Sequence, residues 1–225
     1  MRKFILSIIL AIFLCFNVFA ASQNTSSTTG ATFITQIRYI LNDEETTKFW
    51  DDAELLRWIN DGLEDIAIKT HCLENTESIS LISDIIEYTL VSTTYIVIKA
   101  VHYVDSDSIS EALLKGTPVN VGHTTKRDEP QEWYDWNGKI GVYPALESAT
   151  TETVTLYLVE IPTAIASGGT IPTPQIFDNA LRAFVISRAY QKDRQYAKAA
   201  QWLAVYNSEV TRYRQDFIEQ PKETQ

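Results

Sequence analysis

The residues best suited to metal chemistry are an adjacent histidine and cysteine, His71 and Cys72. Both side chains can bind zinc, but a zinc site needs about four ligands, and neighbouring helical positions point in different directions. The sequence has no second pair of histidines or cysteines at ligand spacing. We therefore expect no metal site.

A second candidate is the run Asp105-Ser106-Asp107-Ser108, which matches the beginning of a calcium-binding loop. The match ends at Ile109 and Ser110, where such a loop would need a ligand and a glycine. The run therefore predicts a solvated turn.

Adjacent carboxylates at Asp51-Asp52 and Asp128-Glu129 are the residue types that act as acid and base in glycoside hydrolysis. In a chain with a formal net charge of −10, such pairs are expected on the solvated surface. The sequence has no Gly-x-Ser-x-Gly elbow, no phosphate-binding loop and no glycine-rich dinucleotide fingerprint. We expect no catalytic residues and no cofactor, and hence a protein that is not an enzyme.

Composition and charge indicate a folded protein that does not bind nucleic acid. Of the 225 residues, 45% are hydrophobic and 21% are charged, which is ordinary for a folded chain. Binding to a phosphate backbone depends on Lys and Arg, so the net charge of −10 disfavours it. The same acidity is compatible with a channel through which DNA passes without sticking.

The N-terminal segment has the pattern of a secretory signal peptide. Arg2 and Lys3 precede an apolar run over residues 4–16, and a small residue, Ala20, stands at the expected cleavage point. A membrane anchor is the alternative, because the run approaches spanning length. Cleavage would leave Cys72 as the only cysteine, so the fold does not depend on an intramolecular disulfide.

Two helices are expected after a polar linker at residues 21–30. The first covers residues 31–41. The second begins at Asp51, whose side chain can cap the N-terminus, and Glu54 three residues later completes a capping-box pattern. Its apolar residues follow at steps of three to four, namely Leu55, Ile59, Leu63 and Ile66.

The middle of the chain has the period and composition of short strands. Segments rich in Val, Ile, Thr and Tyr predict a small antiparallel sheet. A helical turn is expected at residues 111–115. The predicted strands are 78–82, 85–91, 95–104, 139–143 and 153–160.

Two further helices close the chain. Thr173 is a natural N-cap and Pro174 a natural first residue for a helix that ends near residues 192–193. The last helix has a heptad pattern, which must be buried against a helix of the same chain or of a neighbour. Its apolar positions are Tyr196, Ala199, Leu203, Tyr206, Val210, Tyr213 and Phe217.

These elements predict an α+β fold with an N-terminal helical pair, a small central antiparallel β-sheet and a C-terminal pair of long helices. We expect a signal-peptide-like segment at residues 1–20, the linker at 21–30 and a single domain at 31–220. Within that domain, helices in 31–72 and 174–220 would form a bundle, and residues 77–162 would be a β insertion.

The segment from Phe49 to Gly62 resembles the opening signature of the head–tail connector (adaptor) proteins of tailed bacteriophages. It has their Trp-x-Asp-x-Glu-Leu-Leu start, followed by a helix that carries Asn-x-Gly. Further matches follow in the order of that family, and the resemblance covers residues 31–218. They lie at residues 130–133, 138–144, 157–162, 171–172 and 180–193.

The resemblance implies a structural virion protein at the head–tail junction. Such subunits form a ring, commonly of twelve copies, which joins the portal protein to the tail proteins. DNA would pass through the ring lumen without sequence-specific binding. The resemblance makes residues 196–220 the candidate inter-subunit or portal contact, in particular Tyr206, Val210, Tyr213 and Phe217.

The signal-like segment supports a competing hypothesis, because virions assemble in the cytoplasm, where an exported adaptor has no use. On this hypothesis the chain is an exported envelope or extracellular protein-binding module with a C-terminal helical hairpin. It would be processed after Ala20 and found in the periplasm or outside the cell.

Overall fold

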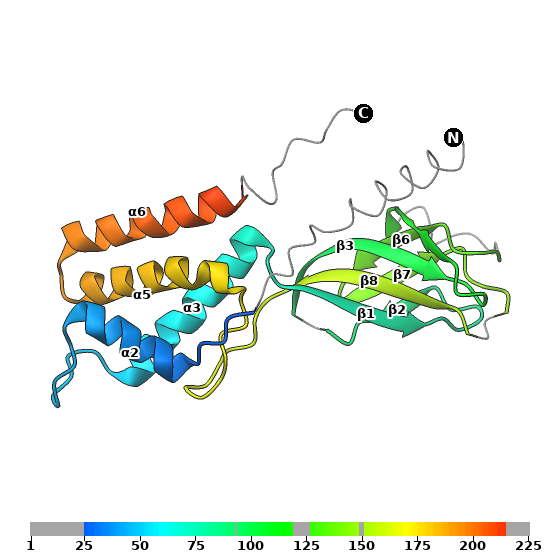
Figure 1. Cartoon of the computed structure of the whole chain (residues 1–225). Coiled ribbons are helices and arrows are strands. Elements are labelled where there is room, and N and C mark those ends of the chain that lie inside the picture. The colour runs from blue at the N-terminus through cyan, green and yellow to red at the C-terminus, as the bar shows by residue number, and fades with distance from the viewer. Residues whose placement is uncertain (1–24, 93, 119–126, 149–150, 215–225) are drawn as a thin grey trace, which may run out of the picture.

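The computed structural model describes residues 25–92, 94–118, 127–148 and 151–214. The predicted segment 1–20 and Phe217 lie outside these residues. Figure 1 shows a helical lobe beside a β lobe, with both ends of the described chain in the helical lobe. The α+β class, with helices before and after the strands, is confirmed. In the described part of the chain, no helix has both the length and the hydropathy needed to span a membrane.

The helical lobe contains α2 (Gly30–Leu41), α3 (Asp52–Thr70), the 3-10 turn η1 (Gln175–Phe177), α5 (Asp178–Lys192) and α6 (Tyr196–Tyr213). Apolar side chains from all of these elements share one core. The two ends of the chain therefore stabilise each other, as burial of these stripes requires. Core residues with no more than 1% exposure include Phe33, Ile37, Leu55, Ile59, Leu63, Leu181, Val185 and Tyr206.

Of three residues predicted to cap helix ends, one does so in the structure and two do not. Asp51 caps α3 as predicted, and its Oδ1 accepts a hydrogen bond of 2.8 Å from the backbone N–H of Ala53. Glu54 instead forms an ion pair with Lys192 at the end of α5. Thr173 is not an N-cap: its hydroxyl has no hydrogen-bond partner among the described residues, and a 3-10 turn precedes α5.

The β lobe contains two sheets where the sequence predicted one. The strands are β1 (Glu74–Ser80), β2 (Glu87–Thr89), β3 (Tyr95–Val104), β4 (Ser110–Ala112), β5 (Leu114–Lys115), β6 (Glu132–Trp136), β7 (Lys139–Tyr143) and β8 (Thr153–Glu160). The first sheet has the order β1-β8-β3-β4 and the second β2-β7-β6-β5. All pairs are antiparallel except β5 with β6, which is parallel.

The helical turn predicted at residues 111–115 is wrong, because residues 111–112 belong to β4 and residues 114–115 form β5. Ala112 pairs with His102 of β3, and Leu114 pairs with Glu132 of β6. The local sequence favours a helix, but pairing with two distant strands decides the conformation.

One apolar core lies between the two sheets. Every second residue of β8 is buried, at Val154, Leu156 and Leu158, which is the alternation expected of a strand with one covered face. These side chains share a cluster with Trp133 of β6 and Ile140 of β7, so the two sheets pack face to face.

Gly141 is required where the second sheet is most crowded. It lies on β7 directly opposite Tyr134 of β6. A Cβ atom at this position would lie 2.0 Å from Cζ of Tyr134. The Tyr134 side chain is 6% exposed, and its hydroxyl donates a hydrogen bond of 3.1 Å to Glu87. The ring therefore fills the space that an alanine side chain would need.

We expect Gly141→Ala to lower the free energy of unfolding by about 1–3 kcal/mol, because the tyrosine ring must leave its position. Urea denaturation followed by tryptophan fluorescence measures this change. Gly168→Ala is the matched control, since a Cβ there would have no neighbour within 4 Å. Equal midpoints for the two variants would contradict the prediction.

Candidate functional site

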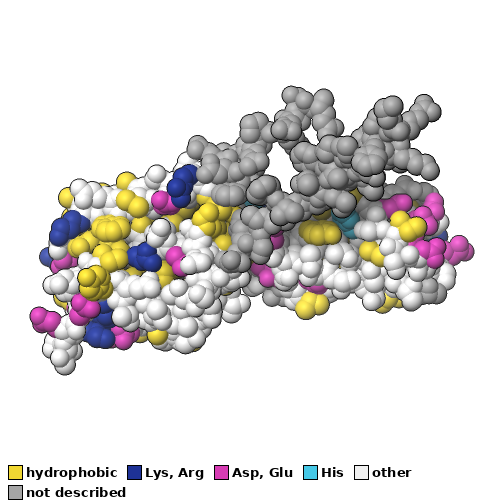
Figure 2. Space-filling model, viewed as in Figure 1, with side chains coloured by type: hydrophobic (Ala, Val, Ile, Leu, Met, Phe, Trp, Pro, Cys, Tyr) yellow, Lys and Arg dark blue, Asp and Glu magenta, His cyan; other side chains and the backbone are white. Residues whose placement is uncertain are grey.

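The distribution of charge differs between the two lobes. Figure 2 shows basic, acidic and hydrophobic side chains intermixed on the helical lobe, and Asp and Glu gathered at the end of the β lobe farthest from the helices. Along the sequence, residues 74–160 carry fourteen Asp and Glu against five Lys and Arg. A binding surface for another protein fits this pattern better than a reaction centre does.

The histidine–cysteine pair has a structural position. His71 ends α3 with a positive φ of 53°, and its backbone N–H donates to Ala67. Burial raises the pKa of the neighbouring Cys72 thiol to about 11. A thiol that stays protonated at neutral pH is a poor nucleophile and metal ligand. In the described part of the chain, no group of three or more His, Cys, Asp and Glu side chains could hold a metal ion.

The carboxylates singled out from the sequence shape turns and helix ends. Oδ1 of Asp105 accepts hydrogen bonds of 2.9 Å from Asp107 N–H and 2.8 Å from Ile109 N–H, which closes the turn between β3 and β4. Asp128 accepts from the N–H of Glu129 at 3.0 Å. The contact from Asp107 to Asp105 is an Asx turn, which needs no bound ion.

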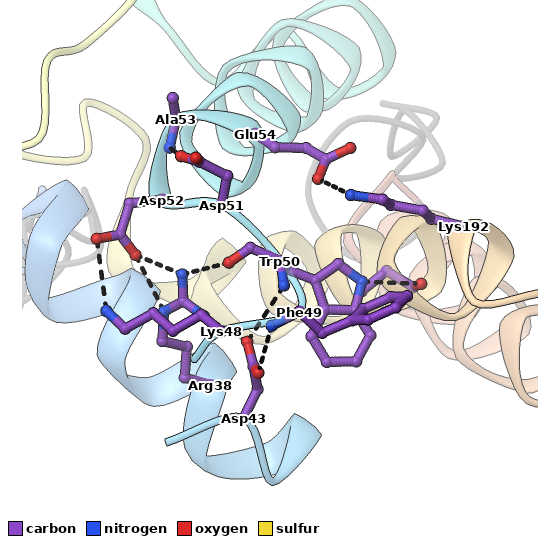
Figure 3. A network of polar contacts seen from close by, with 11 residues as sticks. Arg38, Asp43, Lys48, Phe49, Trp50, Asp51, Asp52, Ala53, Glu54 and Lys192 are labelled. Atoms are coloured by element: carbon purple, nitrogen blue, oxygen red, sulfur yellow. Dashed lines mark hydrogen bonds and ion pairs between the residues drawn. The ribbon is translucent and has the colours of Figure 1, made fainter. Parts of the chain in front are cut away.

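A buried ionic network that the sequence analysis missed holds the loop before α3 (Figure 3). Arg38 of α2 and Asp43 are 5% and 6% exposed and form an ion pair. Arg38 Nε donates to Asp52 Oδ1 at 3.0 Å, and Nη2 donates to the carbonyl oxygen of Trp50 at 2.6 Å. Asp43 Oδ1 accepts from Phe49 N–H at 2.9 Å. The network thus joins α2, the loop and the first turn of α3.

The sequence carries a signal for this network. Arg38 lies on the buried face of α2 together with Ile34, Ile37 and Leu41. A charged residue within an apolar stripe requires a partner, because an unpaired buried charge is strongly unfavourable. The hydrogen bond from Arg38 lowers the pKa of Asp52, which favours the charged form of this carboxylate.

The loop fixed by this network also joins α3 to α5. Trp50 is 6% exposed, and its Nε1–H donates to the carbonyl oxygen of Ala189 at 3.2 Å. Phe49 packs edge-on against Trp50, with ring centroids 4.8 Å apart, and is 55% exposed. Lys192 Nζ lies 5.6 Å from the Phe49 ring centroid while it pairs with Glu54. The Trp-x-Asp-x-Glu pattern therefore serves to hold the helices together.

Three of the four candidate contact residues face the core of their own chain. Tyr206, Val210 and Tyr213 of α6 are 1%, 4% and 7% exposed, and Phe217 lies outside the described residues. The apolar seam of α6 thus packs against α3, η1 and α5 over these positions. Tyr196 and Leu203, which the heptad pattern also included, are 65% and 42% exposed.

Tyr206 lies at the centre of this packing. Its hydroxyl donates a short hydrogen bond to Asp65 of α3, and its ring lies edge-on to Phe184 of α5 with centroids 5.2 Å apart. Lys69 Nζ lies 5.0 Å from the ring centroid. Burial, followed by the hydrogen bond to Asp65 and its charge, raises the pKa of Tyr206, so the hydroxyl remains a donor.

Tyr213, the last residue of α6, packs in the same way. Its ring lies 4.3 Å from that of Phe177 in η1, measured between centroids. The role of these residues in contacts with another subunit stays a prediction.

Comparison with known proteins yields a family match over almost the whole described chain. A family model described as SU10 adaptor protein matches residues 28–223. No curated protein matches. Among solved structures, a chain from the neck of an empty GTA particle computed with C6 symmetry is similar, with 16% sequence identity and a TM-score of 0.31. The similarity covers 75% of this chain and 83% of that one. The family match spans both lobes.

Proposed function

This chain belongs to the SU10 adaptor protein family, and from that premise we propose that it is a ring subunit joining the portal of a tailed bacteriophage to the tail. The observation that carries the proposal is the match over residues 28–223, which includes the helices at both ends and the β lobe between them. It is a structural phage adaptor protein, and its function lies in contacts with other proteins.

The ring follows from what such an adaptor must do. A subunit that connects a portal to a tail around passing DNA has to surround a channel, and cyclic symmetry provides one. We propose about twelve copies, as the family resemblance implies, with the portal and tail proteins as partners. An acidic β lobe suits a wall that DNA passes without binding, because it repels phosphate.

Within the subunit, we propose that residues 31–220 act as one adaptor domain and that the β lobe is its insertion. The segment 196–220 is the proposed portal or inter-subunit contact. Tyr206, Val210 and Tyr213 would then fix the position of α6, while its exposed face and the segment around Phe217 reach the partner. This division follows from the burial of the three side chains in the isolated chain.

Co-expression with the portal protein encoded in the same genome tests the proposal. We expect the full chain to co-purify with the portal and to form rings visible by negative-stain electron microscopy. Mass spectrometry of nuclease-resistant particles should detect the chain together with the portal. A monomer that binds no portal, is absent from particles and begins at Ala21 in an exported fraction would overturn the proposal.

A further inference from the structure

The C-terminal helical hairpin is basic in an acidic protein. Residues 178–214 contain seven Lys and Arg against three Asp and Glu, whereas the whole chain has a net charge of −10. Residues 74–160 have an excess of acidic side chains, with fourteen Asp and Glu against five Lys and Arg. Positive charge is therefore concentrated on the C-terminal hairpin and negative charge on the β lobe, and such separation favours specific association between copies.

Three cations around the connection between α5 and α6 lack an acidic partner. Arg188, Arg194 and Lys198 are exposed, and none forms an ion pair within the described residues. Arg188 lies 5.0 Å from the Phe184 ring centroid and Lys198 lies 5.1 Å from that of Tyr190, so aromatic rings hold them in place. Tyr196 beside them is 65% exposed. We call Arg188, Arg194, Tyr196 and Lys198 the turn patch.

A surface of opposite charge lies at the connection between β3 and β4. Asp107 and Glu111 are exposed and pair with no cation in the described part of the chain. Two large apolar side chains lie beside them in sequence, Ile109 with 57% exposure and Leu114 with 73%. We call Asp107, Ile109, Glu111 and Leu114 the hairpin patch.

The field around the hairpin patch is negative. Burial, together with the charges of Glu152, Glu129, Asp105 and Glu111, raises the pKa of the neighbouring Tyr103 hydroxyl to about 12. Carboxylates from several separate segments therefore converge on this end of the β lobe. Cations placed there would lower the energy of the whole group.

The two patches lie at opposite ends of the molecule. The first residue of β3, Tyr95, pairs with Glu160, whose N–H donates to Leu73 just after α3. The strand then runs away from the helical lobe, so that the hairpin patch follows its far end (Figure 1). The connection between α5 and α6 lies at the other extreme of the helical lobe (Figure 1). A copy cannot join its own two patches, but two copies can.

We propose that the turn patch of one copy binds the hairpin patch of the next copy. The patches have opposite charge, and each presents exposed apolar area beside its charges, which is the composition of a protein interface. A contact between two different patches is heterologous, and it closes into a ring when the rotation between copies permits. The inference rests on the proposed ring and names the contact that forms it.

A matched pair of charge-reversal variants tests the contact. Arg194→Asp with Lys198→Glu reverses the turn patch, and Lys48→Glu with Arg57→Glu makes the same change in net charge elsewhere on the helical lobe. Lys48 and Arg57 are both exposed and lie outside the proposed contact segment 196–220. We expect the turn-patch variant to raise the dissociation constant for self-association about 10-fold or more in sedimentation velocity. The control should remain within about 3-fold of the wild type.

Restoration of binding is the decisive readout. We expect Asp107→Lys with Glu111→Lys to weaken association alone and to restore it when mixed with, or combined with, the turn-patch reversal. Association of the wild type should also weaken between about 0.1 M and about 1 M salt, where the Debye length falls from about 10 Å to about 3 Å. Each variant must keep the circular dichroism spectrum and melting temperature of the wild type.

The outcomes separate this inference from the proposed function. Rings on the portal that form equally well with the turn-patch variant would overturn the contact and leave the adaptor function standing. Loss of portal binding without rescue by the hairpin-patch reversal would assign the turn patch to the portal and also overturn the contact. If the wild type forms no ring in the presence of the portal, the contact and the ring function both fail.

Discussion

Replacement of Arg38 by alanine is expected to lower the free energy of unfolding by about 3–5 kcal/mol, the cost of leaving a buried charge without its partner. Asp43 is 6% exposed, and Arg38 is the cation that pairs with it. The backbone N–H groups of Phe49 and Trp50, which donate to Asp43 at 2.9 Å and 3.4 Å, compensate only part of its charge. The variant would also free the Trp50 carbonyl oxygen and the loop that it fixes.

Thermal unfolding monitored by circular dichroism measures this effect. For a protein of this size, a loss of 3–5 kcal/mol corresponds to a melting temperature lower by about 6–20 °C. Arg57→Ala is the control, since Arg57 is exposed and forms no ion pair within the described residues. A melting temperature for Arg38→Ala within about 2 °C of the control would show that the network does not stabilise the fold.

The pH dependence of the free energy of unfolding tests the role of Arg38 independently. Its hydrogen bond holds the pKa of Asp52 below the ordinary value of 3.8, so the folded state binds this proton less readily than the unfolded state. The resulting stability is present above about pH 4 and is lost as the pH falls through the folded pKa. Arg38→Ala lacks this contribution. The free energies of unfolding of wild type and variant should therefore become more similar as the pH falls from about 5 to about 3. The expected effect on the free energy of unfolding is small, since the Asp52 side chain is 59% exposed and its ion pair is screened by solvent.

The sequence predicted well those elements that have a helix cap or an apolar pattern repeated over many residues. The cap at Asp51 and the apolar stripe up to Ile66 predicted most of α3, and the pattern in residues 153–160 predicted β8 with its bounds. Both signals are local, because each residue repeats the geometry of its neighbours. The family resemblance, which rested on an ordered set of such elements, is confirmed.

The parts that failed depend on partners far away in the chain. Strands of two or three residues, such as β4 and β5, are too short to show a period, and only pairing with β3 and β6 defines them. The division of the strands into two sheets could therefore not be predicted from the sequence, because strand order depends on the pairing and not on any one segment. The ionic network failed for a similar reason: its three side chains come from α2, a loop and the start of α3.

The heptad in α6 shows the same limit for the candidate site. The spacing identified Tyr206, Val210 and Tyr213 as members of one apolar seam, and the structure places them together. Spacing alone gives the face that must be buried, but it does not tell whether the covering helix belongs to the same chain. The exposed fractions of these residues in the single chain supply that information.

Tyr206→Ala tests whether the Tyr206 side chain is covered by its own chain or by a neighbouring subunit. We expect it to lower the free energy of unfolding of the isolated chain by about 3–5 kcal/mol, as for other large aromatic side chains removed from a core. The deleted ring packs against Phe184, and Lys69 lies over its face, so its removal leaves a cavity in the core of the helical lobe. Denaturant unfolding of the monomeric chain, at concentrations below those of assembly, isolates this effect.

Tyr206→Phe and Leu203→Ala separate the causes. The phenylalanine variant keeps the ring and loses the hydrogen bond to Asp65, which retains Lys69 at 2.7 Å, so its expected cost is about 0.5–1.5 kcal/mol. Leu203 lies on the same helix with 42% exposure, and its removal should cost less than Tyr206→Ala. If Tyr206→Ala left the unfolding of the single chain unchanged and weakened only the assembly, Tyr206 would be a contact residue between subunits. The burial of its ring and the bond to Asp65 favour the opposite result, in which α6 must first dock on α3 and α5 before its exposed face can meet a partner.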